Sequence, residues 1–533
     1  MKFKVVIAEN MAEDGINVLR YEPDFSVILA DAVQERLEKE LQNADALVVR
    51  SGVKVTRELL SHAPQLKIVG RAGAGVDTID IDACSERGVV VMRTPGANSN
   101  GVVELTVALM LSLVRHIPAA DAKMKEGIWA KKALKGTELR GKTLGMVGLG
   151  KIGASVAAIC HGMGMSVKAL VRDKNKVRNP PFQGEYVDSL EELLPHVDFL
   201  SLHVPLNEHT RGMIGKDQFA QMKPKAYIIN TARGPAIDEQ ALYDALKEGK
   251  IAGAGIDVYS EEPADKNKLK FIELENVIAT PHLGATTEES QKNVSRIICE
   301  NIITALQTGV FLDAVNLPFA ISGDKAETYA PYIGLAKRMG QFIGQWHSKQ
   351  VEKIEITYRF TQNVDITPLL TTAAVEILKT QGIDVSLITA QQVLEENGIE
   401  LKNKESQNLA YDDSFKIAVV YKDGTNFSAR GVITAKSVPQ IVEIENTPIQ
   451  FVPQGLLLGH ENKNVPGVVG AIGTLLGNEK INISNLYLSG GEADKHVFGC
   501  VAIDRISKEE KANLLEKIDQ LENIEHACWL HFD

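Results

Sequence analysis

The segment KTLGMVGLGKIG, residues 142–153, decides how the first half of this chain folds. An apolar run leads into the spacing G-x-G-x-x-G, formed by Gly148, Gly150 and Gly153, and an alanine-rich stretch follows. A strand, a glycine turn and a helix in this order are the context of a dinucleotide site, because the helix N-terminus offers N–H groups to the phosphates. Gly148 permits the tight turn, Gly150 lets the pyrophosphate approach the backbone, and Gly153 allows close helix–strand packing. The predicted cofactor contacts in this loop are Gly148, Gly150, Lys151, Ile152 and Gly153.

The tip of the next predicted strand distinguishes the two nicotinamide cofactors. In SVKALVRDKNK the tip is Val171, 171 − 148 = 23 positions after Gly148, and Arg172 and Asp173 follow it. A carboxylate at the tip accepts the ribose 2′-hydroxyl of NAD, whereas an arginine there accommodates the 2′-phosphate of NADP. Asp173 could still serve NAD if the loop folds back. The sequence therefore predicts a nicotinamide cofactor, NAD, while NADP stays open because Val171-Arg172 replaces the expected acidic strand tip.

Short apolar runs alternate with polar, helix-like runs on both sides of the glycine loop. The predicted strands are 4–8, 46–50, 67–73, 89–93, 142–147, 197–205, 226–234, 251–259 and 276–284, with a helix over 33–43. Such alternation predicts parallel sheets covered by helices. We therefore expect an α/β protein whose first 317 residues form two Rossmann-like, doubly wound lobes.

The second half of the chain has a different texture. Strand-like stretches and a helical one predict an intervening α+β region without a catalytic motif. The final segment follows the order strand, helix, strand, strand, helix, strand, which is the ferredoxin-like βαββαβ arrangement. Such an appended domain is more suited to sensing than to catalysis. The predicted domains are a substrate lobe (1–97 plus 287–317), a dinucleotide domain (98–286), an intervening domain (318–452) and a regulatory domain (453–533).

The composition limits the classes of function. Hydrophobic residues make up 44% and charged residues 24% of the 533 residues, as in ordinary soluble proteins. A net charge of −11 and a pI near 5.7 argue against a nucleic-acid-binding body. The apolar core at 5–8 is too short for a signal peptide, and the longest apolar run, 102–114, is interrupted by Glu104 and falls short of a membrane span. The five cysteines lack metal-ligand spacing, so we expect reduced thiols, no metal and a cytoplasmic location.

Three predicted strands end in loops with chemically useful side chains. TARGP carries Arg233, DVYSEEP carries Glu262, and TPHLGAT carries His282. Open α/β sheets bind their ligands at the carboxyl ends of the strands. With these loops in this order, the sequence resembles the D-isomer-specific 2-hydroxyacid dehydrogenase family and its Arg…Glu…His set. The resemblance is clear over 1–315 and 455–533, where the end resembles the ACT domain of long family members, and weaker between them.

The resemblance implies oxidation of D-3-phosphoglycerate to 3-phosphohydroxypyruvate, the first step of L-serine biosynthesis. Oxidation of a 2-hydroxy acid removes a hydride from C2 and a proton from the hydroxyl group. A histidine with a pKa near neutrality, here His282, can take that proton and return it in reverse. Glu262 would orient the imidazole and favour its charged form. Arg233 offers a planar fork for the substrate carboxylate.

Further contacts follow from the resemblance alone. Asp257 would hold the nicotinamide carboxamide, and Asn98 would reach the active site, with a helix N-cap as the equal alternative. The residues expected beside the cofactor are His203, Pro205, Thr210, Thr231 and Ala232. The residues expected to bind the substrate carboxylate through backbone N–H groups are Ala74, Gly75 and Val76. The candidates for the phosphate are Arg50, Ser51 and Lys54, together with Trp129, Lys131 and Lys132 from a partner subunit, unless these lysines form only a solvated face.

The final domain carries a turn, HENKNVPGVVG, that resembles the effector turn of ACT domains. The candidate effector residues are Asn464, Val465, Pro466, Gly467, Asn482 and Ile483. Asn464–Val465 stands where an Asp-Arg pair is common, so the carboxylate that would meet an amino group is missing. L-serine is the expected effector and a purely structural dimerisation domain is the alternative. We expect a homodimer or homotetramer without nucleic-acid or membrane partners.

Two other functions stay open on the sequence alone. Reduction of glyoxylate or hydroxypyruvate would suit Arg172 if NADP is used, although the ACT-like end argues against it. A dinucleotide-sensing corepressor can keep the same Arg-Glu-His set on the same scaffold. The long C-terminal region and the lack of a disordered tail favour an effector-gated enzyme.

Overall fold

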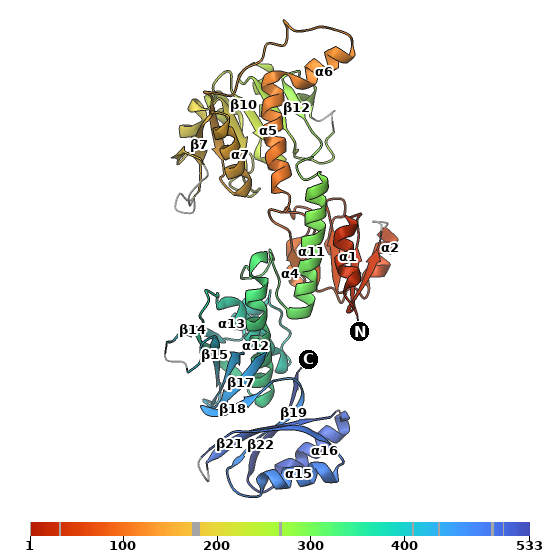
Figure 1. Cartoon of the computed structure of the whole chain (residues 1–533), viewed down its shortest axis with the longest axis vertical. Coiled ribbons are helices and arrows are strands. Elements are labelled where there is room, and N and C mark those ends of the chain that lie inside the picture. The colour runs from red at the N-terminus through yellow and green to blue at the C-terminus, as the bar shows by residue number, and fades with distance from the viewer. Residues whose placement is uncertain are drawn as a thin grey trace. The chain divides into compact units, whose positions relative to one another are not determined.

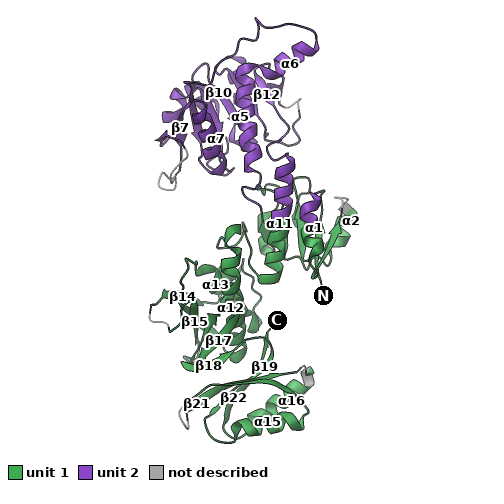
Figure 2. Cartoon of the chain, viewed as in Figure 1, with its two compact units in different colours: residues 1–10, 18–93, 298–533 green, residues 11–17, 94–297 purple. Residues whose placement is uncertain are grey.

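The computed structural model describes residues 2–30, 34–172, 182–265, 269–407, 410–434, 438–491, 495–504 and 506–532 (Figure 1). The chain forms two compact units, which Figure 2 distinguishes by colour. Unit 1 comprises Met1–Asn10, Val18–Arg93 and Ile298–Asp533, and unit 2 comprises Met11–Asn17 and Thr94–Ile297. The four predicted domain boundaries stay predictions.

Unit 2 contains a parallel seven-stranded sheet in the order β12-β11-β10-β9-β6-β7-β8. Its strands are β6 (Thr143–Val147), β7 (Ser166–Leu170), β8 (Gly184–Val187), β9 (Phe199–Leu202), β10 (Tyr227–Asn230), β11 (Gly253–Ile256) and β12 (Val277–Ala279). Its helices are α5 (Ser99–Arg115), α6 (Ile117–Lys125), α7 (Lys151–Gly162), α8 (Leu190–Leu193), α9 (Lys216–Gln221) and α10 (Glu239–Lys247). The chain moves outward from β6 in one direction and from β9 in the other, so a switch point lies between β6 and β9. The predicted doubly wound fold is confirmed.

Helices cover both faces of this sheet. Met110 of α5 and Cys160 of α7 share a core with Met146 of β6 on one face. On the other face, Phe219 of α9 and Leu246 of α10 pack in a second core. Because both faces are buried, the central strands β6, β9, β10 and β11 are buried almost throughout, whereas β7 alternates and the edge strand β8 is mostly exposed.

Unit 1 begins with a parallel five-stranded sheet in the order β2-β1-β3-β4-β5. Its strands are β1 (Phe3–Ile7), β2 (Phe25–Leu29), β3 (Ala46–Val49), β4 (Ile68–Arg71) and β5 (Val90–Met92). Its helices are α2 (Gln34–Leu41), α3 (Arg57–Ser61) and α4 (Ile81–Glu86), while α1 (Glu13–Tyr21) and α11 (Glu288–Thr308) each begin in unit 2 and end in unit 1. This is the flavodoxin-like order, with its switch point between β1 and β3. The edge strand β2 was not among the strands predicted from the sequence.

The intervening region forms a six-stranded mixed sheet in the order β14-β13-β15-β16-β17-β18. Its strands are β13 (Val351–Arg359), β14 (Glu400–Glu405), β15 (Ser414–Tyr421), β16 (Asn426–Ile433), β17 (Pro439–Ile444) and β18 (Thr447–Phe451). Its helices are α12 (Ala326–Trp346), α13 (Thr367–Thr380) and α14 (Ala390–Glu396). The helices α12 and α13 pack closely because Gly340 carries no side chain: a Cβ there would lie 2.6 Å from Ala373 O.

The C-terminal region forms an antiparallel sheet in the order β20-β21-β19-β22. Its elements are β19 (Gly455–Lys463), α15 (Val468–Asn478), β20 (Ile483–Leu488), β21 (His496–Ile503), α16 (Lys508–Asp519) and β22 (Ile524–Phe532), which confirms the βαββαβ order. One face of the sheet packs on α15 and α16 through Leu458 and Ile472. The other face shares a core with the intervening region. Gly459 makes room for Trp346 of α12, whose Cζ3 atom would lie 2.7 Å from a Cβ at that position.

Within the described ranges, no single helix is long and apolar enough to cross a membrane. The bent pair α5–α6, with 63° between its helices, passes the same length and composition test only when both are taken together. Most apolar side chains on the inner face of α5 are buried, among them Met110 and Leu113. The predicted cytoplasmic location stays a prediction.

Candidate active site

Three neighbouring strands of the unit 2 sheet carry the three predicted catalytic side chains. Arg233 follows β10, Glu262 follows β11, and His282 follows β12. Because β10, β11 and β12 are adjacent and parallel, their carboxyl ends lie along one edge. The structure brings Glu262 and His282 together: Nδ1 of His282 lies 2.7 Å from Oε2 of Glu262. The family resemblance, carried by three motifs at strand ends, thus located a carboxylate–imidazole pair whose members are 20 residues apart.

The His282 loop is held by a buried carboxylate. His282 has a left-handed backbone with φ 54°, which non-glycine residues adopt rarely. Its N–H donates to Asp257 O at 2.9 Å. Oδ1 of Asp257 accepts from the Thr280 hydroxyl (2.6 Å) and from Leu283 N (2.7 Å), and Oδ2 accepts from Gly284 N (3.0 Å). Asp257, only 1% exposed, therefore fixes this turn, and its contact with a nicotinamide amide stays a prediction.

The charges of the pair favour an ionised state of both groups. The hydrogen bond from His282 to Glu262 raises the pKa of the imidazole above its ordinary value; burial opposes this, and the charges of Glu262 and Asp257 support it. For Glu262, burial would raise the pKa, but the hydrogen bond and charge of His282, the Tyr259 N–H and the charge of Arg233 together lower it. The pair is thus set up to hold and release one proton at His282.

Replacing Glu262 by glutamine is expected to lower the pKa of His282. The amide keeps the shape of the side chain but removes the charge that stabilises the imidazolium. The measurement is an NMR titration of ¹³C-labelled histidine, with the His282 signal assigned by its loss in His282→Gln. Glu191→Gln, an exposed carboxyl change on α8, is the control. An unchanged His282 pKa in Glu262→Gln would contradict the pairing.

The Arg233 turn is clamped from within. The buried Asn230 donates from Nδ2 to Arg233 O (2.9 Å) and accepts from Ala232 N at Oδ1 (3.1 Å). The Arg233 guanidinium donates from Nη1 to Ala232 O at 2.7 Å. Thr231 points into α5, where its hydroxyl lies 2.8 Å from that of Thr106. Arg233 is therefore presented on a turn with little freedom, close enough for its charge to lower the pKa of Glu262.

The glycine loop has the geometry that its predicted roles require. Gly148 has φ 95°, and a Cβ there would lie 2.5 Å from His203 O. A Cβ on Gly153 would clash with Gly148 O, so both glycines permit close backbone packing. Around Gly150, at the N-terminus of α7, a Cβ would meet no atom within 4 Å. The loop thus combines a tight turn with an open helix N-terminus, which fits a pyrophosphate.

Other predicted cofactor residues lie around this loop. Burial lowers the pKa of His203 to about 4, and its Nε2 lies 2.8 Å from the Ser201 hydroxyl, so the ring is neutral near pH 7. The Thr210 hydroxyl donates to Pro205 O (2.7 Å) and closes the next turn. Lys151 donates from Nζ to Gly96 O at 3.3 Å. Ile152 packs against the core under α7.

At the end of β7 the structure offers no carboxylate among the residues it describes. Val171 is half-buried against the core and Arg172 is exposed. Asp173 lies outside the described residues, as does the segment that follows it to residue 181. The tip of the strand is therefore apolar and is followed directly by a cation.

The predicted substrate contacts of the first lobe belong to unit 1 and stay predictions. Glu9 accepts hydrogen bonds from the backbone N–H groups of Arg50 (2.6 Å), Gly52 (2.8 Å) and Val53 (3.1 Å), while Arg50 Nη1 donates to Asn10 O (3.0 Å). The N–H groups of these three residues are thus already used, which leaves the side chains of Arg50, Ser51 and the exposed Lys54 as candidates for a phosphate contact. In the glycine-rich loop that includes Gly75 and Val76, Arg93 Nη1 donates to Ala74 O at 3.2 Å.

Asn98 in unit 2 occupies the N-cap position of α5 but makes no capping hydrogen bond with its side chain. A Cβ on Gly101, one turn further, would lie 2.7 Å from Gly284 O. The first turn of α5 therefore packs against the His282 loop. The predicted reach of Asn98 to the active site stays a prediction; the alternative of a helix N-cap is confirmed for its position, although the side chain makes no capping hydrogen bond.

The predicted effector residues lie at opposite ends of the C-terminal sheet: the Asn464 turn follows β19 where Lys463 pairs with His496, whereas Ile483 starts β20 where it pairs with Ile503. Asn464 donates from Nδ2 to Gly491 O (2.9 Å), so it ties the turn before α15 to the β20–β21 loop. Val465 and Pro466 lead into Gly467, which has φ 103° and precedes α15. Asn482 and Ile483 are exposed at the start of the edge strand β20. Effector contacts of these residues stay predictions.

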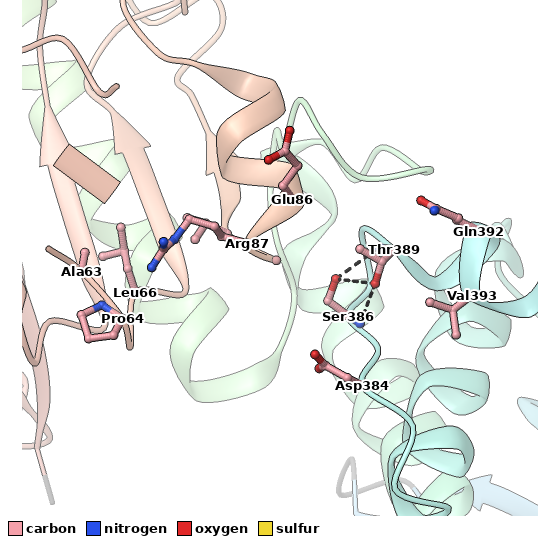
Figure 3. A pocket seen from close by; sticks show the side chains of 12 residues that line it. Ala63, Pro64, Leu66, Glu86, Arg87, Asp384, Ser386, Thr389, Gln392 and Val393 are labelled. Atoms are coloured by element: carbon pink, nitrogen blue, oxygen red, sulfur yellow. Dashed lines mark hydrogen bonds between the residues drawn. The ribbon is translucent and has the colours of Figure 1, made fainter. Parts of the chain in front are cut away.

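A separate polar cavity of ≈ 430 Å³ in unit 1 contains none of the predicted site residues (Figure 3). Its walls come from the α3–β4 and α4–β5 loops and from the segment around the start of α14. Ser386 and Thr389 bond to each other there, with Ser386 N 3.0 Å from the Thr389 hydroxyl oxygen. We assign no role to this cavity in the chemistry of His282.

Two residues of the site were missed in the sequence. Gly234 and Tyr259 both stand in quoted motifs, TARGP and DVYSEEP, next to residues that were singled out. A Cβ on Gly234 would clash with the backbone of Tyr259, which shows how tightly the two loops pass. Their closeness to Arg233 and Glu262 in the chain was the only signal available.

Comparisons with known proteins agree with this geometry. The family described as D-isomer specific 2-hydroxyacid dehydrogenase, NAD binding domain, matches residues 107–284, and the D-3-phosphoglycerate dehydrogenase intervening domain matches 328–445. The D-3-phosphoglycerate dehydrogenase of Methanocaldococcus jannaschii is 37% identical over 98% of this chain and 99% of its own. The enzyme of that name from Bacillus subtilis is 37% identical over 92% and 94%.

Solved structures resemble a little over half of the chain. The D-lactate dehydrogenase of Aquifex aeolicus, solved with NAD and lactic acid, is 31% identical with a TM-score of 0.52, over 57% of this chain and 96% of its own. The NADPH-dependent glyoxylate/hydroxypyruvate reductase of Sinorhizobium meliloti, solved with NADP and malonate, is 27% identical with a TM-score of 0.52, over 59% and 97%. The fold and the family match define an NAD(P)-dependent oxidoreductase that acts on 2-hydroxy acids. Within that class, the chain belongs to the D-3-phosphoglycerate dehydrogenase family.

Proposed function

We propose that this chain oxidises D-3-phosphoglycerate at C2 to 3-phosphohydroxypyruvate, the first step of L-serine biosynthesis. The observation that carries the proposal is similarity to D-3-phosphoglycerate dehydrogenases over nearly the whole chain, including the intervening domain at 328–445. The similar lactate and glyoxylate structures align with at most 60% of this chain while using nearly all of their own. They therefore leave the rest of this chain without a counterpart.

His282 acts as the base in the oxidation. Its Nδ1 is bonded to Glu262, which leaves Nε2 to take the hydroxyl proton, and the side chain is 49% exposed and therefore accessible to a substrate. Glu262 orients the ring and stabilises the imidazolium that forms. A nicotinamide held at the glycine loop would supply the acceptor for the hydride that leaves C2. Arg233 binds the substrate carboxylate and so directs C2 and its hydroxyl toward His282.

The test is the initial rate of reduced-cofactor production from D-3-phosphoglycerate, with NAD and NADP assayed in parallel. The expected result is turnover with this substrate that exceeds turnover with D-lactate or D-glycerate. Glyoxylate and hydroxypyruvate are assayed for reduction, because the similar Sinorhizobium meliloti structure is a reductase of these acids. Reduction of these acids without oxidation of D-3-phosphoglycerate would establish that second function instead.

For the cofactor we propose NADP over NAD. Val171 at the end of β7 is apolar, so it offers no acceptor for a ribose 2′-hydroxyl. Arg172 is exposed beside it and can pair with a 2′-phosphate through charge-assisted hydrogen bonds. Gly150 at the N-terminus of α7 leaves the space that the pyrophosphate of either cofactor requires.

For the C-terminal domain we propose that L-serine binds at the Asn464 turn and inhibits the enzyme. Asn464 offers amide groups there, although the turn lacks a carboxylate for the ammonium group. L-Serine is expected to reduce the rate, and Asn464→Ala is expected to weaken this effect about fivefold, the usual value of one hydrogen bond. Asn403→Ala on the exposed strand β14 is the control. If L-serine neither binds nor changes the rate, the domain would be explained as a structural dimerisation domain.

We further propose a homodimer or homotetramer. Two apolar surfaces support it. On the α6 side, Ile117 is 54% and Trp129 78% exposed, and on the edge strand β20, Leu486 is 42% and Leu488 46% exposed. Large apolar side chains exposed in groups are typical of association surfaces. Analytical ultracentrifugation would give the number of subunits, and a monomer at micromolar concentration would contradict the proposal.

A further inference from the structure

Tyr259 lies where the three loops of the candidate active site meet. It follows β11 by three residues, is 7% exposed, and stacks on Phe271 with 6.5 Å between ring centroids. Burial, followed by the charges of Asp257 and Glu262, raises the pKa of its hydroxyl group to about 12. The hydroxyl therefore stays protonated and acts as a hydrogen-bond donor throughout the physiological pH range.

Each of the three loops contacts a different part of Tyr259. Its N–H donates to Oε1 of Glu262 at 3.1 Å, on the carboxyl oxygen that His282 does not use. Its hydroxyl donates to Thr280 O at 2.9 Å, two residues before His282. Its carbonyl carbon packs so closely on Gly234 that any Cβ there would clash. One residue thus links the turns that carry Arg233, Glu262 and His282.

The hydroxyl bond complements the hold of Asp257 on the same turn. Asp257 bonds the side chain of Thr280 and the N–H groups of Leu283 and Gly284, so it holds both ends of the turn. Tyr259 adds a second contact at the near end, through the carbonyl oxygen of Thr280. With both ends held, the strained backbone of His282 at φ 54° keeps its imidazole within reach of Glu262.

We propose that Tyr259 is a positioning residue, whose hydroxyl bond to Thr280 O holds His282 at hydrogen-bonding distance from Glu262. The inference rests on the proposed function, since it concerns the acid–base pair of that reaction. Tyr259 touches neither the substrate nor the cofactor in this role. It acts by keeping the hydrogen bond between His282 and Glu262 short. This keeps the pKa of His282 raised and its ring oriented.

Tyr259→Phe tests the proposal because it removes only the hydroxyl group. The expected result is a fall of kcat by about fivefold, the usual value of one hydrogen bond, with KM for the substrate unchanged. The pKa of His282 is expected to move down toward its ordinary value, because the bond to Glu262 lengthens. The acid limb of the pH–rate profile for oxidation should move down with it. Tyr243→Phe, the same deletion on α10 at the edge of the same core, is the control.

The NMR titration of His282 separates the two ways in which this could fail. It needs no turnover, so a lowered His282 pKa in Tyr259→Phe supports the positioning role even if D-3-phosphoglycerate is not the substrate. An unchanged His282 pKa together with an unchanged pH profile would overturn the role, whatever the substrate. Gly234→Ala is the second variant: it forces the Arg233 turn away from Tyr259, and we expect a larger loss of kcat. The charge of Arg233 lowers the pKa of His282, so its displacement should not reproduce the fall expected for Tyr259→Phe. A loss of kcat in Tyr259→Phe without a fall in the His282 pKa would limit Tyr259 to packing.

Discussion

Replacing His282 by glutamine is expected to lower kcat for 2-hydroxy acid oxidation by about 10²- to 10⁴-fold, the range that general acid–base groups contribute. Glutamine keeps a polar side chain that can still bond to Glu262, so the loss reports the missing proton acceptor and not a collapsed loop. The measurement is the steady-state rate with saturating cofactor, and KM should change little. His161→Gln, an exposed histidine change on α7, is the control. Unchanged turnover in His282→Gln would refute the assignment of His282 as the base.

The assignment of His282 as the base also predicts the direction in which the rate changes with pH. Because Glu262 raises the pKa of His282, the neutral imidazole that oxidation requires forms only above the ordinary histidine pKa of 6.5. The rate of oxidation is therefore expected to rise with pH through a value above 6.5, and the rate of the reverse reduction to fall over the same range. His282→Gln should remove this limb from both profiles.

The backbone of His282 offers an independent check. Glycine adopts a φ of 54° without steric strain. His282→Gly should therefore keep the turn that Asp257 holds while leaving a space in place of the imidazole. Added imidazole is then expected to restore part of the activity of this variant. Restoration in His282→Gly but not in wild type would tie the lost proton transfer to the missing ring.

The catalytic pair could be predicted because it depends on local patterns repeated along the chain. Each of β10, β11 and β12 ends with a polar motif, and parallel neighbours bring such ends together. The role of Tyr259 could not be predicted in the same way. Its hydroxyl bonds a carbonyl oxygen 21 residues away, and no residue type or spacing announces a backbone acceptor. Asp257 is a second example. The sequence motif suggested only a contact with the nicotinamide, whereas the structure shows that Asp257 also accepts four hydrogen bonds from the His282 turn.

The fold was predictable where burial leaves a periodic pattern. The sheets of both Rossmann-like lobes and the βαββαβ order followed from such patterns. Helix α12 was not predicted because it contains Pro331 and several glycines, residues that usually interrupt helices. Gly340 is needed there for contact with α13, a tertiary demand that outweighs helix propensity. Strand β2 was not predicted because it is a short edge strand of five residues that is partly exposed and so lacks a clear apolar pattern.

The double substitution Val171→Asp and Arg172→Ala is expected to shift the preference from NADP to NAD by about 10³-fold in the ratio of kcat/KM values. Removing the guanidinium costs NADP a charge-assisted hydrogen bond, about 1.5–3 kcal/mol. The new carboxylate repels the 2′-phosphate and offers the ribose 2′-hydroxyl of NAD an acceptor. About 4 kcal/mol in total corresponds to that ratio. The measurement is kcat/KM with each cofactor at fixed substrate.

The single variants separate the two contributions. Arg172→Ala should lower kcat/KM with NADP and leave kcat/KM with NAD unchanged. Val171→Asp should raise kcat/KM with NAD even with Arg172 present. Lys225→Ala removes an exposed charge at the amino end of β10, at the opposite edge of the sheet from the glycine loop, and should change neither cofactor. A wild-type enzyme that already prefers NAD, with NADP rates unaffected by Arg172→Ala, would contradict our proposal. The 2′-hydroxyl contact would then fall to Asp173, and Asp173→Ala would have to abolish the NAD preference, because no other carboxylate lies within two residues of the strand tip.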